Sequence, residues 1–118
     1  MGDRANFGFR DRKGDTVYLY GHWAGYEMLG TLARAVNVAK PRWTDEPYAT
    51  RIAISNIVGP DWEQLTGWGV TVNELCDNEH KVPVINWEEQ TFTLYEEDLS
   101  TEVFHMPLQD FVDKYSQP

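Results

Sequence analysis

The stretch VYLYGHWAGYE, residues 17–27, decides how the chain is interpreted, because it joins an extended run to a helical one. Its start alternates: the valine and leucine fall on one side of an extended chain and the two tyrosines on the other, as in a strand with one buried face. Gly21 ends the alternation, and helical spacing begins near Tyr26. The stretch therefore predicts a strand, a corner at His22-Trp23, and then a helix.

The residues before this stretch alternate in the same way. ANFGFR, residues 5–10, places two phenylalanines on one face and smaller or polar residues on the other. DRKGD, residues 11–15, then supplies turn chemistry, with Gly14 free to adopt a positive φ. The first 21 residues therefore predict a β-hairpin.

Two helices are expected to follow the corner. YEMLGTLARAVNVAK, residues 26–40, has the apolar spacing of an amphipathic helix, which Pro41 ends. In residues 44–58, Thr44 is a natural N-cap and Pro47 fits the first turn. The β-branched content of RIAISNIV leaves a strand as an alternative to this second helix.

The second half of the chain reads mainly as strands. Residues 68–72 alternate, and KVPVINWEEQTFTLYEED, residues 81–98, predicts a second hairpin with its turn at NWEEQ. Pro83 places its first strand at a sheet edge or at a bulge. An extended piece at residues 103–106 and a short helix follow. The order ββααβββ predicts one α+β domain over residues 1–118, with an antiparallel sheet of about five strands, two helices on one face and a short C-terminal helix.

Composition narrows the class of protein. Hydrophobic residues make up 42% and aromatic residues 14% of 118 residues, which is typical of one folded domain. The first residues have no apolar signal-peptide core, and Cys76 is the single cysteine, so we expect a cytoplasmic protein. No GxGxxG or GxxxxGK[ST] motif occurs, and we expect no cofactor.

The net charge of −9 is distributed unevenly. Residues 1–60 carry eight Arg/Lys against six Asp/Glu, a net charge of +2, whereas residues 61–118 carry two against thirteen, a net charge of −11. Direct binding of nucleic acid is therefore disfavoured, because the second half would meet like charge. The acidic half is either a face for a basic protein partner or solvated surface that aids solubility.

Several motifs together resemble a known set of proteins. They are MGDRAN, VYLYGHWAG, RWTDEPYATRIAIS, TGWGV and DNEHKVPVINWEEQTF, in the pattern YLYxHWxG, RWxDExYxxRI, TGxG. This pattern is similar to that of small proteins encoded by tailed bacteriophages and some bacteria, over most of residues 1–95. The resemblance implies a phage source but no chemistry. Small acidic phage proteins often act on host machinery, which favours a binding role.

The His22-Trp23 corner is the first candidate site. A histidine at a strand-to-helix junction can act as acid or base or contact a ligand, but no serine or cysteine neighbours it in sequence as a nucleophile. The alternative is structural, with Trp23 filling the end of the core. CDNEH, residues 76–80, lacks the ligand spacing of a zinc site and reads as turn residues, so no metal is expected.

Two further groups of residues are candidates. Arg4 and Asn6 on the first strand, with Tyr48 and Arg51 near the start of the second helix, are placed to bind an anionic ligand, or else form ion pairs. A partner-binding group consists of aromatic and acidic residues in polar segments: Trp62, Trp87, Glu88 and Glu89.

The sequence thus favours a small, acidic, phage-encoded protein without catalysis that binds a protein partner, either a second copy or a basic host protein, and no membrane. One alternative is a ligand- or nucleotide-binding protein or enzyme with a pocket around His22, Trp23, Arg4 and Arg51. Another alternative is a minor component of the virion.

Overall fold

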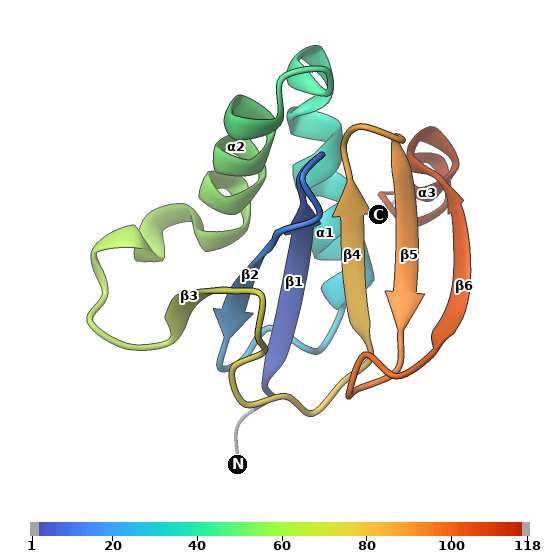
Figure 1. Ribbon diagram of the computed structural model, residues 1–118. Helices are drawn as coiled ribbons and strands as arrows, with labels where there is room; N and C mark the ends of the chain where they lie inside the picture. Colours follow the sequence, from blue (N-terminus) through green and yellow to red (C-terminus); the bar gives the residue numbers. More distant parts are fainter. Residues whose placement is uncertain (1–2, 117–118) are drawn as a thin grey trace.

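The computed structural model describes residues 3–116; residues 1–2 and 117–118 of the predicted domain lie outside that range. The strands are β1 (Ala5–Arg10), β2 (Thr16–Gly21), β3 (Trp68–Val72), β4 (Val82–Asn86), β5 (Thr91–Tyr95) and β6 (Glu102–Pro107). The helices are α1 (Met28–Val38), α2 (Glu46–Val58) and α3 (Leu108–Tyr115), with short 3₁₀ helices η1 (Lys40–Arg42) and η2 (Gly59–Glu63). The predicted α+β class is confirmed, and the segment with two alternatives is a helix, α2 (Figure 1).

The sheet has six strands in the order β3-β2-β1-β4-β5-β6. Every neighbouring pair is antiparallel except β1 and β4, which are parallel. The prediction of about five antiparallel strands is therefore corrected on two points. The piece at residues 103–106 is a full edge strand, β6. The sheet also consists of two antiparallel three-stranded units whose first strands, β1 and β4, run side by side in the same direction.

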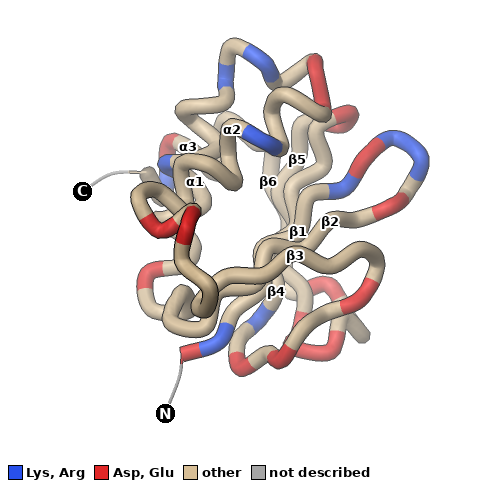
Figure 2. The backbone as a smooth tube through the Cα atoms, turned by 90° about the vertical axis from the view of Figure 1, so that its left-hand side faces the viewer, with Lys and Arg blue, Asp and Glu red and all other residues tan. Residues whose placement is uncertain are grey.

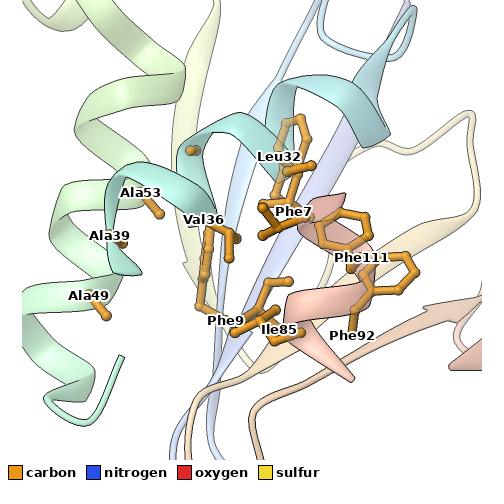
Figure 3. Packing of buried hydrophobic residues seen from close by; sticks show 14 of the residues in the cluster. Phe7, Phe9, Leu32, Val36, Ala39, Ala49, Ala53, Ile85, Phe92 and Phe111 are labelled. Carbon is orange, nitrogen blue, oxygen red and sulfur yellow. The ribbon is translucent and has the colours of Figure 1, made fainter. Parts of the chain in front are cut away.

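The main core lies between one face of the sheet and the helices. Phe7 of β1 lies opposite Leu19 of β2, and Phe9 lies beside Ile85 of β4, so that all four side chains share this face. Figure 3 shows α1 laid across them. At the other end of the sheet, α3 is held by a stacked pair of rings, Phe111 on Phe92, with centroids 4.0 Å apart.

Helix α2 lies at one side of the helical layer and packs mainly against α1 (Figure 3). Its buried residues Ala49 and Ala53 are small, which lets the two helices approach closely. Because α2 leans on α1, the helix-side face of β2 and β3 lacks a complete cover. Val70 and Val72 of β3 point to that face and remain 59% exposed.

Two local predictions are wrong. Pro83 lies in β4, between β1 and β5, and not at a sheet edge. The ladder between β1 and β4 starts only at Val84, so the proline precedes the first residue paired with β1. Tyr26 lies before α1 and is exposed, because Glu27 has a left-handed φ of 64° and the helix begins at Met28.

Candidate functional site

His22 and Trp23 lie at the end of β2, as predicted. The His22 ring shares a hydrogen bond of 2.9 Å between its Nδ1 and the Tyr20 hydroxyl, and it meets the Trp23 ring edge-on at 4.3 Å. Partial burial raises the pKa of the Tyr20 phenol. The expectation that Trp23 fills the end of the core is wrong: its backbone bridges to Asp3 and its side chain is 70% exposed.

The corner is closed by an aspartate–histidine pair that the sequence did not predict. The Asp3 carboxylate is hydrogen-bonded to His80 Nε2, and its other oxygen accepts the Tyr26 N–H at 2.5 Å. A Cβ at Gly25 would overlap the His80 ring, so only glycine fits beneath this pair. The hydrogen bond to His80, with that from Tyr26, holds the pKa of Asp3 below its usual range.

The lowered Asp3 pKa predicts a pH dependence of stability. A carboxyl group whose pKa is lower in the folded state stabilises the fold above its unfolded pKa of about 3.9, and that contribution is lost as the pH falls through the folded value. We expect the free energy of unfolding to fall less steeply below about pH 4 in Asp3→Asn than in the native chain. Urea unfolding between pH 3 and pH 6 measures this. Glu97→Gln, at an exposed side chain, is the control, and equal slopes in all three proteins would contradict the prediction.

Arg4 and Asn6 hold the loop of residues 76–80 against β1. The Arg4 guanidinium lies 3.3 Å from Asp77 Oδ2 and 3.5 Å from Glu79 Oε1. Asn6 is fully buried; its Nδ2 donates to Asp77 O at 3.2 Å, and its Oδ1 accepts the Cys76 N–H at 3.3 Å. The segment predicted as turn residues is therefore a loop that these two side chains hold in place. The polar groups of Arg4 and Asn6 bind to this loop and not to a ligand.

Tyr48 and Arg51 lie elsewhere. The Tyr48 ring is covered by the Arg42 guanidinium at 5.1 Å, and Arg51 lines a groove beside Arg12 at the tip of the β1–β2 hairpin. Arg4 stands at the start of β1 and the hairpin tip follows its end. The residues predicted to bind a ligand therefore lie in separate places and do not line one cleft.

The residues predicted to bind a partner also lie in different environments. Trp87 is 1% exposed, stacks on Phe9 with ring centroids 6.1 Å apart, and donates from Nε1 to Thr50 Oγ1 at 2.9 Å. Its assignment to an exposed interface is therefore wrong. Glu88 and Glu89 are exposed in the β4–β5 turn, whereas Trp62 is 74% exposed on η2. The β4–β5 turn and η2 lie apart in Figure 1.

Trp62 is one of several apolar side chains that neighbouring segments leave exposed or half-buried, and we call this set the β3–α2 surface. It consists of side chains from the open sheet face, α2, η2 and the loop before β3: Val17, Ile54, Trp62, Leu65, Val70 and Val72. Leu65 is 99% exposed, and Val72 lies opposite Val17 across the strands. Trp68 Nε1 donates to Asp61 at 3.4 Å and ties η2 to β3.

A groove of about 480 Å³ continues this surface between α2 and the β1–β2 hairpin. Its apolar lining comes from Phe9, Val17, Pro47 and Ile54. The sequence held one signal of this surface, the uncharged alternation of residues 68–72. That alternation did not show which face of β3 is exposed to solvent, because the exposed face depends on the packing of α2 against α1.

Another cavity, about 590 Å³, lies over the helix-free sheet face and is lined mostly by polar and charged side chains. Within residues 3–116, no three His, Cys, Asp or Glu side chains come together as metal ligands. No helix in that range has the length and apolar content needed to cross a bilayer. No protein-family model matches the chain, and no curated protein or solved structure shows significant similarity to it.

Proposed function

We propose that this protein acts by binding another protein through the β3–α2 surface, without catalysis of its own. The observation that carries the proposal is the joint exposure of Trp62, Leu65, Val70 and Val72 on adjoining segments. A soluble chain seldom leaves large apolar side chains grouped in this way unless they meet a partner. Tryptophan is also among the residues that contribute most to binding at protein interfaces.

The distribution of charge supports a binding role for this surface. Figure 2 faces the side of β3 and α2, where β3 itself carries no charge and the charged residues lie in the surrounding turns and on α2, which carries Arg51 midway along its length. The charged tip of the β1–β2 hairpin, with Arg12 and Lys13, and the acidic residues Asp61 and Glu63 of η2 flank the apolar area. An apolar centre with a charged rim is the usual anatomy of a protein interface.

The alternative of a ligand pocket or active site at His22, Trp23, Arg4 and Arg51 gains no support from the geometry. Arg4 is engaged by the 76–80 loop, and Arg51 lines a groove at the other end of β1. The phage source rests on the sequence motifs alone. Mass spectrometry of purified phage particles tests the proposal that the chain is a virion component.

The double variant Trp62→Ser/Leu65→Ser tests the proposed function. Both side chains are exposed, so the free energy of unfolding should change by less than about 0.5 kcal/mol. Proteins that co-purify with the tagged chain, including an untagged copy of the same chain expressed with it, should fall by at least about tenfold, the equivalent of about 1.4 kcal/mol of binding energy.

Val103→Ser is the control, because Val103 is also exposed but lies on β6, at the opposite edge of the sheet. It should retain the native set of co-purified proteins. If the double variant and the native chain recover the same proteins in equal amounts, the β3–α2 surface is not the binding site.

A further inference from the structure

Strand β3 leaves a row of backbone hydrogen-bonding groups unpaired at one edge of the sheet. The β2–β3 ladder continues beyond the strand ends, where the Asn73 N–H donates to Thr16 O at 2.8 Å and the His22 N–H donates to Gly67 O at 2.9 Å. Hydrogen-bonded pairs alternate in an antiparallel ladder, so the odd-numbered residues of β3 bond to β2. The N–H and C=O groups of Trp68, Val70 and Val72 therefore point away from the sheet, and no loop within residues 3–116 bonds to them.

The two edges of the sheet differ in how they are protected. At the far edge, β6 carries Glu102, His105 and Pro107, and its pairing with β5 is irregular at Leu94/Tyr95. Charges, proline and bulges are the usual devices that keep an edge strand from pairing with another chain. By contrast β3, with the sequence WGVTV, has none of these devices. In Figure 2 it lies at the side of the sheet nearest the viewer.

We infer that the partner at the β3–α2 surface is a second copy of this chain, paired through β3 to β3 in antiparallel orientation. This inference rests on the proposed function and names its partner. The two-fold register that pairs all five residues of β3 places Val70 opposite Val70 of the other copy, and Trp68 opposite Val72. The outward groups of Trp68, Val70 and Val72 then meet their counterparts, and the two sheets become one.

Side chains reinforce this pairing. Residues that lie opposite in a ladder share a face, so Val70 and Val72 of both copies come together on the helix side. The η2 helix and the loop after it project beyond β3 (Figure 1), and these two segments contain the exposed residues Trp62 and Leu65. The strand bears no charge, so no like charges lie directly opposite across the new ladder.

The dependence on salt separates a second copy from a basic partner. Two copies with a net charge of −9 each repel one another, and salt screens that repulsion. We therefore expect dimerisation to strengthen as the ionic strength rises. Attraction between this acidic chain and a basic protein would weaken under the same change.

Sedimentation equilibrium of the purified protein over a concentration series tests the inference. The native chain should form a dimer, and Val70→Lys should raise the dimer dissociation constant by more than about tenfold, because it places a charge on the edge. Val103→Lys on β6 is the matched control and should remain dimeric. A native chain that is monomeric at every concentration would overturn the inference, as would a dimer unaffected by Val70→Lys.

A disulfide trap tests the register in a folded chain. In a Cys76→Ser background, Val70→Cys should link two copies under mild oxidation, since hydrogen-bonded antiparallel pairs have Cα atoms about 5.5 Å apart. Val72→Cys should not, because the two copies of residue 72 are displaced by four residues, about 14 Å along the strand. Equal cross-linking of both variants would contradict the register.

The two proposals can fail separately. If the native chain is monomeric but Trp62→Ser/Leu65→Ser loses its co-purified proteins, the second copy is excluded and the binding function stands. If the native chain neither dimerises nor loses any co-purified protein in that variant, both proposals are wrong.

Discussion

Trp87→Ala is expected to lower the free energy of unfolding by about 3–5 kcal/mol, the usual cost of removing a large aromatic side chain from a core. The indole is buried between the sheet and α2, stacked on Phe9 and hydrogen-bonded to Thr50 Oγ1. Its loss would leave a cavity at the junction of β4, β1 and α2. For a domain whose total stability is about 5–15 kcal/mol, such a loss brings the chain close to unfolding.

Urea denaturation at neutral pH measures this effect. Trp87→Phe should retain most of the stability, because it keeps an aromatic ring against Phe9 and loses only part of the volume and one hydrogen bond. Glu88→Gln, one residue along the same turn, is the control and should change stability by less than about 0.5 kcal/mol. If Trp87→Ala unfolds at the native urea midpoint, its indole does not belong to the core.

Asn6→Ala is expected to cost about 2–3 kcal/mol, because buried polar groups that lose their partner carry a desolvation penalty of about 1–3 kcal/mol each. The Asn6 amide bonds to the backbone at Cys76 and Asp77 and to the side chain of Asn78. Without it, the loop that carries His80 against Asp3 loses its hydrogen bonds to β1 and keeps the contacts with Arg4, just before that strand.

Two measurements distinguish this role from a general loss of stability. Amide hydrogen exchange within residues 76–80 should accelerate more than exchange within β4 or β5, because the loop opens first. Asn56→Ala, at an exposed asparagine of α2, should leave both stability and exchange unchanged. Uniform acceleration across all strands would show that Asn6 acts on the whole fold and not on this loop.

The candidate site was only partly predictable. The ion pair with a carboxylate that was considered as an alternative for Arg4 is present, and its partners are Asp77 and Glu79. Those partner residues lie more than 70 positions away along the chain. No local pattern connects a first strand to a distant turn, so the sequence left the choice between a ligand and a structural role open.

The burial of Trp23 and Trp87 could not be predicted from the sequence either. Trp23 follows an apolar strand and was expected to be buried, whereas Trp87 sits among acidic residues and was expected to be exposed. Burial of a single side chain depends on which element covers it. The α2 helix covers Trp87 through Thr50, while the bridge to Asp3 leaves Trp23 in solvent.

The sequence by itself determined the α+β class, the first helix except for its exact start, the two hairpins and the shared face of Phe7 and Phe9, because these follow from hydrophobic periodicity and turn chemistry within a few residues. Only the tertiary structure decided the parallel junction of β1 with β4, the position of α2 against α1, and the open edge at β3. These features arise from contacts between segments that are far apart in the sequence. Because α2 packs mainly on α1, it leaves the helix-side face of β3 exposed, and that exposed face belongs to the surface that we propose for binding.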